Sequence, residues 1–236
     1  MRAARAAIRV RSLVGFALVV VAAGCATARP ASVPAVPNLA DAKRQVSEYV
    51  ASGRYEADIA AVVASARAYL EGRAASGGKL AIVLDIDETA LSNYPALRAN
   101  DYGFILGGPC ELPRGPCGFV AWLESARAEP IVPVRELARF ARERGVAVFF
   151  LTGRPERFRV ATETNLRAAG YDWTAVILKP DELTTRSAAE FKAWERRKLV
   201  EQGWVIVINV GDQRSDLDGG HAERTYKLPN PFYFVP

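Results

Sequence analysis

Four short apolar runs, separated by segments with helical periodicity, limit the folds that this chain can adopt. They cover residues 80–84, 146–151, 175–178 and 205–210, and β-branched residues are frequent in them. Continuous apolar runs of this length are typical of strands that are buried on both faces of a parallel sheet. Because helical segments alternate with these strands, the sequence predicts an α/β fold built on a doubly wound parallel sheet.

Other segments lie outside this alternation. Apolar residues at helical spacing predict an N-terminal helical extension, with helices at 39–50 and 55–74 that pack on the core domain. Residues 94–133, which follow the first strand, have no clean period, and we expect a small cap insertion there at the mouth of a site. The tail at 225–234 is apolar and interrupted by prolines, and we expect it to close over the edge of the sheet.

The first 24 residues have the features of a secretory signal peptide. Four arginines and no acidic residue accompany an apolar stretch at 13–23 that is too short to span a bilayer comfortably. Ala22-Ala23-Gly24-Cys25 then resembles a bacterial lipobox, with alanine at position 22 where leucine is usual. A lipobox implies cleavage before Cys25, diacylation of its thiol and a membrane anchor, whereas an ordinary secretory signal is the alternative.

This leader sets the expected domain boundaries and location. Residues 25–37 are rich in proline and alanine and predict a lipid-anchored linker, which leaves residues 38–236 as the folded domain. No aspartate follows Cys25, which favours the bacterial outer membrane, with the periplasm as the alternative. The net charge of +5 includes four arginines in the leader, and the remaining +1 argues against a nucleic-acid surface.

In an exported chain, one of the three cysteines can carry a lipid and the other two can form a pair. Cys25 would carry the lipid, whereas Cys110 and Cys117 remain in a segment rich in glycine and proline. In an oxidising compartment these two can form a disulfide, which would stabilise such a loop. A metal site built from two cysteines alone is the weaker alternative.

Polar side chains follow three of the four predicted strands. Asp85 and Asp87 follow the first strand, Thr152 the second, and Asp212 and Asp216 the fourth. The carboxyl ends of parallel strands meet at one edge of a sheet, where open α/β folds bind their ligands. Aspartates that gather there repel one another, and Mg²⁺, which prefers hard oxygen ligands, would relieve this repulsion.

The motifs at these strand ends resemble those of the haloacid dehalogenase (HAD) superfamily of phosphatases. The matching stretches are Asp85-Ile-Asp87-Glu-Thr89, Phe150-Leu-Thr152-Gly-Arg154, Lys192 and Gly211-Asp212-x-x-x-Asp216. A narrower resemblance is to the acid phosphatase branch that includes bacterial lipoprotein phosphatases and plant vegetative storage proteins. It rests on Asp87-Glu-Thr-Ala-Leu-Ser-Asn93, Phe191-Lys192-x-x-x-Arg196, Gly211-Asp-Gln-x-Ser-Asp-Leu217 and Lys227-Leu-Pro-Asn-Pro-Phe-Tyr233.

This resemblance implies an exported acid phosphatase with a HAD-like, Rossmannoid fold that uses Mg²⁺ to hydrolyse small phosphomonoesters. Asp85 would attack phosphorus and form an aspartyl-phosphate, because a carboxylate needs no deprotonation near neutral pH. Asp87 would protonate the leaving alkoxide and then activate the water that cleaves the intermediate. Splitting the reaction in two suits a substrate whose uncatalysed hydrolysis is among the slowest known.

The resemblance also implies which residues hold the metal and the phosphate. The metal ligands would be Asp85, Asp87 through its backbone carbonyl, Asp212 and, directly or through water, Asp216. The phosphoryl oxygens would be held by the Thr152 hydroxyl, the Gly153 amide and the Lys192 ammonium.

For some of these residues, the sequence allows a competing residue or a second role. Lys179 competes with Lys192 as the phosphate-binding lysine, and Lys192 is favoured because it lies in the Phe-Lys-x-x-x-Arg motif. Arg154 binds either the substrate or a structural carboxylate. Trp122 and Tyr94 either stack on an aromatic substrate or belong to the core of the insertion.

The sequence leaves three alternatives to a metal-dependent hydrolase. A phosphohistidine mechanism would depend on His221, the single histidine, whose position in a predicted loop disfavours this role. A non-catalytic surface or storage-like protein would keep the fold without the nucleophile, and the presence of Asp85 favours the enzyme. Transfer of the phosphoryl group to an acceptor other than water is also compatible with the sequence.

Overall fold

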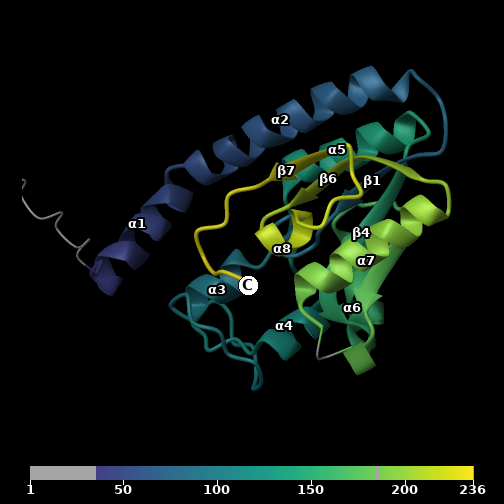
Figure 1. Ribbon diagram of the computed structural model, residues 1–236. Helices are drawn as coiled ribbons and strands as arrows, with labels where there is room; N and C mark the ends of the chain where they lie inside the picture. The colour runs from purple at the N-terminus through teal and green to yellow at the C-terminus, as the bar shows by residue number, and fades with distance from the viewer. Residues whose placement is uncertain (1–35, 184–185, 236) are drawn as a thin grey trace, which may run out of the picture. The chain divides into compact units, whose positions relative to one another are not determined.

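The chain folds around a five-stranded sheet with the order β5-β4-β1-β6-β7, in which all neighbouring strands are parallel (Figure 1). We analysed a computed structural model, which describes residues 36–183 and 186–235. The strands are β1 (Leu80–Leu84), β4 (Ala147–Pro155), β5 (Ala175–Lys179), β6 (Val205–Gly211) and β7 (Arg224–Lys227). The predicted α/β fold with a parallel sheet is therefore confirmed.

The central strand β1 is buried on both faces, which explains its uninterrupted apolar sequence. Ile82 and Leu84 point into the larger apolar core, and Ala81 and Val83 point into a smaller core on the opposite face. Burial of each large aliphatic side chain stabilises the fold by about 1.5–3 kcal/mol. A strand in which polar residues alternate with apolar ones would place polar side chains in one of these two apolar cores.

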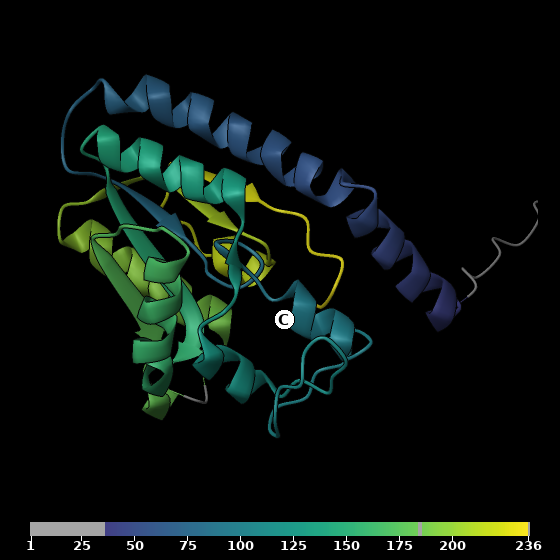
Figure 2. The same ribbon diagram turned by 180° about the vertical axis from the view of Figure 1, so that it is seen from behind.

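Helices cover both faces of the sheet. The larger core is closed by α2 (Arg54–Ala74), α5 (Val132–Glu143) and α6 (Arg159–Ala168), and Figure 2 shows α2 lying along α5. The smaller core is closed by α7 (Ala188–Glu201). Both predicted N-terminal helices are present, because α1 (Leu39–Ala51) precedes α2. No helix in residues 36–183 and 186–235 has the length and apolarity needed to cross a membrane.

The predicted role of the tail is only partly right. Residues 224–227 do not cover the sheet edge but form the edge strand β7, which pairs with β6. Its sequence, Arg-Thr-Tyr-Lys, is polar because none of its residues is buried, so it lacks the apolar run that marked the other strands. Beyond β7, the tail places Phe232 against Tyr55 and Tyr102, which joins α2 to the insertion.

The insertion has more regular structure than its sequence indicated. It contains α3 (Tyr94–Ala99) and α4 (Phe119–Ser125), and β3 (Glu129–Pro130) pairs with β2 (Leu91–Ser92). Pro95 lies in the first turn of α3, where proline needs no backbone N–H, so this proline is compatible with the start of the helix.

The loop between α3 and α4 is held by two kinds of cross-link. Cys110 and Cys117 form a disulfide. The Asn100 side chain donates to the backbone carbonyl of Cys117 (2.7 Å) and accepts from its N–H (2.8 Å). These links fix a segment whose glycines and prolines could not form a regular element. The leader and Cys25 lie outside the described residues.

Candidate active site

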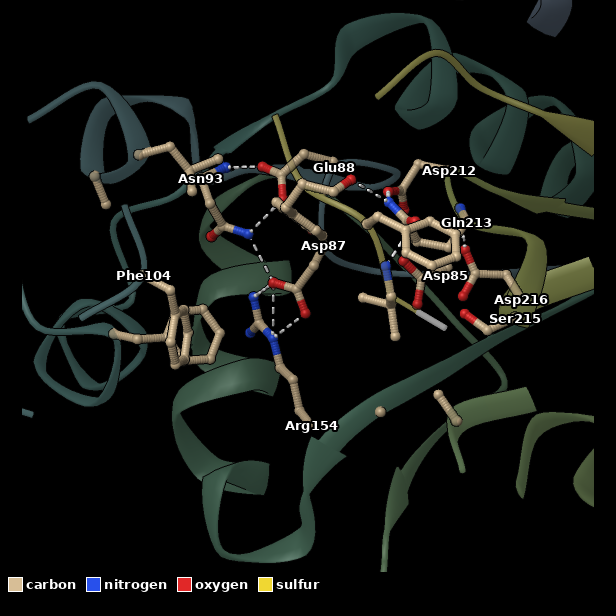
Figure 3. Close-up of a pocket in the computed structure, with 18 of the residues that line it drawn as sticks. Asp85, Asp87, Glu88, Asn93, Phe104, Arg154, Asp212, Gln213, Ser215 and Asp216 are labelled. Carbon is tan, nitrogen blue, oxygen red and sulfur yellow. Dashed lines mark hydrogen bonds and ion pairs between the residues drawn. The ribbon is translucent and has the colours of Figure 1, made fainter. Parts of the chain in front are cut away.

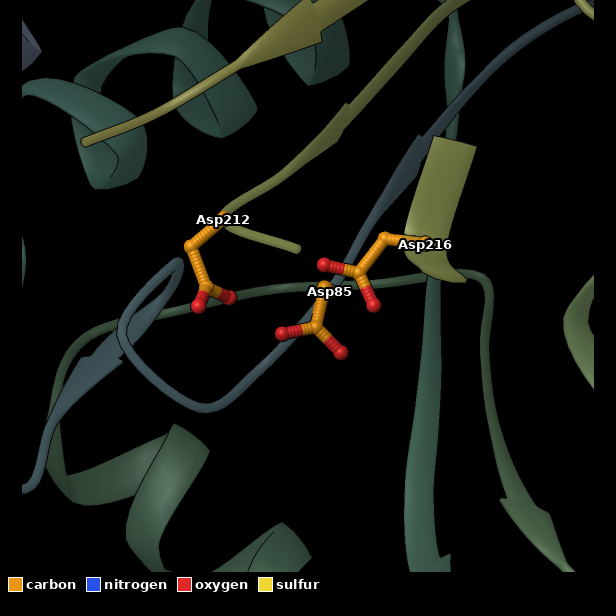
Figure 4. Close-up of side chains that lie close together, drawn as sticks. All are labelled: Asp85, Asp212 and Asp216. Carbon is orange, nitrogen blue, oxygen red and sulfur yellow. The ribbon is translucent and has the colours of Figure 1, made fainter. Parts of the chain in front are cut away.

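Three aspartates meet at the carboxyl end of the sheet (Figure 4). Asp85 directly follows β1, Asp212 directly follows β6, and Asp216 belongs to the short helix α8 (Arg214–Leu217). One carboxylate oxygen of each lies within 4.8 Å of the others, and all three residues are buried. The sequence placed these residues at one edge of the sheet, and the structure brings them into a single cluster.

Burial and mutual repulsion make this cluster costly without a cation. Burial raises the pKa of Asp85, and the nearby Asp216 carboxylate raises it further. The same two causes, in the same order, raise the pKa of Asp212. The raised pKa values show that ionisation of these buried carboxyls is unfavourable on its own. A cation bound beside them would therefore stabilise the ionised cluster.

Lys192 on α7 supplies one cation. Its Nζ contacts Asp216 Oδ1 at 2.6 Å and also pairs with Asp85. Burial opposes the charge on this ammonium, but the two carboxylates outweigh burial and raise the pKa of Lys192. One ammonium balances only one of the three ionised aspartates. The remaining charge of −2 matches a divalent ion.

The spacing of Lys192 and Arg196 on α7 explains how Asp216 is positioned. The two side chains lie one helical turn apart, so both reach the same segment. Lys192 holds the Asp216 carboxylate, whereas Arg196 Nη1 donates to the Asp216 backbone carbonyl at 2.6 Å. Gly211 is required beside them, because a Cβ there would lie 2.3 Å from the Asp216 Cβ.

Asp87 does not belong to the carboxylate cluster and instead forms a bidentate pair with Arg154 (Figure 3). Arg154 Nη2 donates to Asp87 Oδ1 at 2.6 Å, and Nε donates to Oδ2 at 2.9 Å. Burial acts to raise the pKa of Asp87, but the Arg154 guanidinium outweighs it and holds that pKa below its usual value. Of the two roles considered for Arg154, the structure has the ion pair with a carboxylate.

A second contact to Asp87 comes from Asn93, which is itself held by the insertion. Trp122 Nε1 on α4 donates to Asn93 Oδ1 at 2.7 Å. The amide is thereby oriented so that Asn93 Nδ2 donates to Asp87 Oδ1 at 2.8 Å and to Glu88. Trp122 is buried, so it belongs to the core of the insertion, the second of its two predicted roles.

The three residues predicted to bind phosphate lie at different depths relative to the pocket. Gly153 and Lys192 line the pocket, but Thr152 is fully buried beneath it, where its hydroxyl accepts from the Arg154 N–H at 3.1 Å. Lys179 lies apart from the pocket and donates to the Arg186 carbonyl. The exposed His221 does not line the pocket either.

Some pocket residues were not singled out from the sequence. Glu88 is fully buried, and burial together with the Asp87 charge raises its pKa to about 8. Tyr233 from the tail donates to Glu88 at 2.5 Å. Ser215 is buried in the pocket wall, and its hydroxyl has no hydrogen-bond partner among the described residues. Both Glu88 and Ser215 lie inside the family motifs quoted above. Their place in those motifs was the sequence signal that could have identified them.

These observations test whether the residues fit a metal and a phosphoryl group. Buried carboxylate oxygens are the ligand type that Mg²⁺ prefers. A buried hydroxyl without a partner is costly, so the Ser215 Oγ also favours a polar group bound beside Asp216. Asp212 is oriented by Thr89 (3.1 Å), Asn230 (2.6 Å) and Gln213 (2.7 Å), as a ligand with a fixed direction requires. The residues present therefore fit both groups.

Above the cluster the pocket opens to a volume of about 460 Å³. Asp85 and Lys192 lie at its polar end. Its remaining wall is formed mainly by apolar side chains of the insertion and the tail, namely Leu97, Tyr102, Phe104, Ile105, Phe119, Phe234 and Val235.

Comparisons with known proteins give one consistent result. A family model described as HAD superfamily, subfamily IIIB (acid phosphatase) matches residues 16–236. An acid phosphatase 1 from Solanum lycopersicum is 35% identical over 193 residues, which cover 80% of this chain and 73% of that protein. Vegetative storage protein 1 from Arabidopsis thaliana is 31% identical over 201 residues, which cover 84% and 72% respectively. The class C acid phosphatase from Bacillus anthracis shares the fold, with a TM-score of 0.65, 23% identity and coverage of 82% and 86%.

Proposed function

Because the chain belongs to subfamily IIIB of the HAD superfamily, the acid phosphatases, we propose that it hydrolyses small phosphomonoesters through an aspartyl-phosphate on Asp85 with the help of Mg²⁺. The carrying observation is the buried cluster of Asp85, Asp212 and Asp216 with Lys192 at the carboxyl end of the sheet. As a member of this family the protein is a phosphomonoester hydrolase. Mg²⁺ and the covalent intermediate belong to the proposal.

In the first step an Asp85 oxygen attacks phosphorus and the bond from phosphorus to the leaving oxygen breaks. Asp87 gives its proton to that oxygen, so the alcohol leaves neutral. In the second step Asp87 takes a proton from water, whose oxygen attacks phosphorus and releases phosphate and the Asp85 carboxylate. When bound, Mg²⁺ would supply positive charge beside the nucleophile and the phosphoryl group.

The remaining residues hold the reacting groups. Asp85, Asp212, Asp216 and the backbone carbonyl of Asp87 would hold the metal. The Gly153 amide and the Lys192 ammonium would bind phosphoryl oxygens. Thr152 lies beneath the pocket, and among the described residues its hydroxyl accepts from the Arg154 N–H without donating, so its hydrogen would be available to a phosphoryl oxygen.

A storage-like protein without catalysis is less well supported than an enzyme. Three buried carboxylates repel one another and destabilise a fold that makes no use of them. Asp85, the residue whose loss would end catalysis, is present and lies within the cluster. Transfer of the phosphoryl group to an alcohol acceptor stays a prediction, to be measured as phosphate ester formed when an alcohol is added.

Removal of divalent metal tests the proposed function directly. We expect EDTA-treated protein to lose nearly all hydrolysis of an aryl phosphate, and added Mg²⁺ to restore it. Mg²⁺ near 100 times its dissociation constant should also raise the melting temperature, on the order of 5 °C, because it neutralises the carboxylate cluster. An Asp212→Asn, Asp216→Asn double variant should lose this thermal shift. Full activity in the presence of chelator would refute the proposed dependence on a divalent metal.

We also propose that the protein is exported and anchored through Cys25. The anchor is supported by residues 22–25 alone, since the lipobox is a bacterial signal and the two sequence relatives named above are plant proteins. In a bacterial host, wild type should partition into the membrane fraction, and Cys25→Ala should move it to the soluble fraction. Cys110→Ala provides a matched cysteine control that should stay membrane-bound. Equal partitioning of wild type and Cys25→Ala would remove the anchor.

A further inference from the structure

Asn93 is a buried residue whose side-chain amide has a partner for each of its polar groups (Figure 3). Its Nδ2 donates to Asp87 Oδ1 at 2.8 Å and to Glu88 Oε2 at 3.1 Å. Its Oδ1 accepts from Trp122 Nε1 at 2.7 Å. A primary amide has two N–H donors and one carbonyl oxygen, so all of them are used here.

These partners permit only one orientation of the amide. If the amide were turned by about 180°, Oδ1 would face the carboxylates of Asp87 and Glu88, and Nδ2 would face the Trp122 N–H. Acceptors would then meet at one end of the amide and donors at the other, and both contacts would be repulsive. The indole of Trp122 therefore decides which way the amide points, and it acts on Asp87 through Asn93.

The two oxygens of the Asp87 carboxylate have different surroundings. Oδ1 accepts from Asn93 Nδ2, from Arg154 Nη2 at 2.6 Å and from Arg154 Nε at 3.2 Å. Among the described residues, Oδ2 accepts from Arg154 Nε alone, at 2.9 Å. Each carboxylate oxygen has about two lone-pair directions, so Oδ1 is saturated and Oδ2 keeps one direction open. A proton exchanged with a substrate would therefore pass through Oδ2.

Two segments that are distant in the sequence hold the ends of this amide. Trp122 belongs to α4 of the insertion, whereas Tyr233 of the tail donates to Glu88 Oε2 at 2.5 Å. Glu88 also accepts from the backbone N–H of Asn93 at 2.6 Å. Glu88 and Trp122 are buried, so the loss of either would leave a polar group of Asn93 unpaired in the interior. The amide thus has little freedom to move away from Asp87.

We propose that Asn93 is a positioning residue for proton transfer, which fixes the Asp87 carboxylate so that Oδ2 meets first the leaving oxygen and then the attacking water. Trp122 holds one end of the amide, and Glu88 with Tyr233 holds the other. In the first step the hydrogen on Oδ2 passes to the leaving oxygen, and in the second Oδ2 takes a hydrogen from water, so Asp87 ends as it began. This inference rests on the proposed function, because Asn93 has this role only if Asp87 exchanges a proton.

The test compares two esters, in the presence of Mg²⁺, that differ in their need for an acid. Asn93→Leu removes the amide at similar volume, and kcat/KM for ethyl phosphate should fall about 30-fold, as expected for a lost hydrogen bond to a charged group. For dinitrophenyl phosphate, whose leaving group needs no proton, kcat/KM should stay within about threefold of wild type. Its kcat should nevertheless fall, with a burst of dinitrophenolate, because slow attack by water lets the phosphoenzyme accumulate.

Trp122→Phe tests the indole N–H, since phenylalanine keeps an aromatic ring but offers no donor. It should lower kcat/KM for ethyl phosphate about tenfold in the wild-type background. In the Asn93→Leu background it should change kcat/KM by less than about twofold, because the indole acts through the amide. Trp173→Phe is the matched control. Trp173 packs against Phe150 outside the pocket, and its variant should keep both rates.

The outcomes separate this inference from the proposed function. Equal losses on both esters, or full rates on both, in folded Asn93→Leu would overturn the inference, as would effects of the two substitutions that add. If circular dichroism shows that Asn93→Leu does not fold, Trp122→Phe decides: a loss confined to ethyl phosphate supports the inference, and any other result overturns it. Wild type that is inert toward both esters with Mg²⁺ present refutes the proposed function, whereas active wild type with unselective variants refutes the inference alone.

Discussion

Asp85→Asn lowers kcat for an aryl phosphate by at least about 10³-fold, because the amide cannot form the phosphoryl bond on which the first step depends. Asparagine keeps the volume of the buried side chain, so the fold should be retained. The measurement is kcat with Mg²⁺, alongside circular dichroism. Acid-quenched wild type should carry a phosphoryl group on the peptide that contains Asp85, and the variant should not.

A matched control uses a carboxylate far from the pocket. Asp172 is an exposed residue paired with Arg142, and Asp172→Asn should keep the wild-type rate. If Asp85→Asn also kept that rate, or if the phosphoryl group appeared on another peptide, the nucleophile would have to be reassigned.

The second large effect is expected from Asp87→Asn, and it should depend on the leaving group. An alkoxide leaves poorly without a proton, so kcat/KM for an alkyl phosphate should fall by about 10²–10⁴-fold. A dinitrophenolate leaves readily on its own, so kcat/KM for the dinitrophenyl ester should fall far less. The parameter kcat/KM is the appropriate measure because it reports the first irreversible step.

The pH dependence provides the control for this prediction. Arg154 holds the pKa of Asp87 below its usual value, so the protonated acid becomes scarcer as pH rises. Wild-type kcat/KM for the alkyl ester should therefore decline from acidic to neutral pH, and Asp87→Asn should remove that decline. Equal losses for good and poor leaving groups would contradict a role as the acid.

The strands that bear the site were predictable because of where they lie. β1 and most of β4 and β6 are buried on both sides, so the stretches 80–84, 147–151 and 206–208 are apolar throughout. β7 was missed because an exposed edge strand needs no apolar run. The helices of the insertion were missed because α3 and α4 are only six and seven residues long, too short to show a period.

The site was predictable at the level of strand ends and not at the level of contacts. The sequence placed Asp85, Asp212 and Asp216 at one sheet edge and favoured Lys192 over Lys179, and in the structure Lys192 pairs with Asp85 and Asp216. The pairing of Asp87 with Arg154 could not be derived, since it depends on how far β4 extends past Thr152. The orientation of Asn93 by Trp122 depends on the fold of the insertion, which has no sequence period to guide it.

The hydrogen bonds from Trp122 through Asn93 to Asp87 restrict how new specificities can be built on this scaffold. Exchanging the whole insertion between homologues would transplant the wall that meets the leaving group, but it would also remove the indole that sets the amide. Loop grafts confined to residues 101–116 escape this penalty, because α4 stays in place. Changes between α3 and α4, in evolution or in the laboratory, can therefore alter specificity without loss of the hydrogen bond from Trp122 to Asn93.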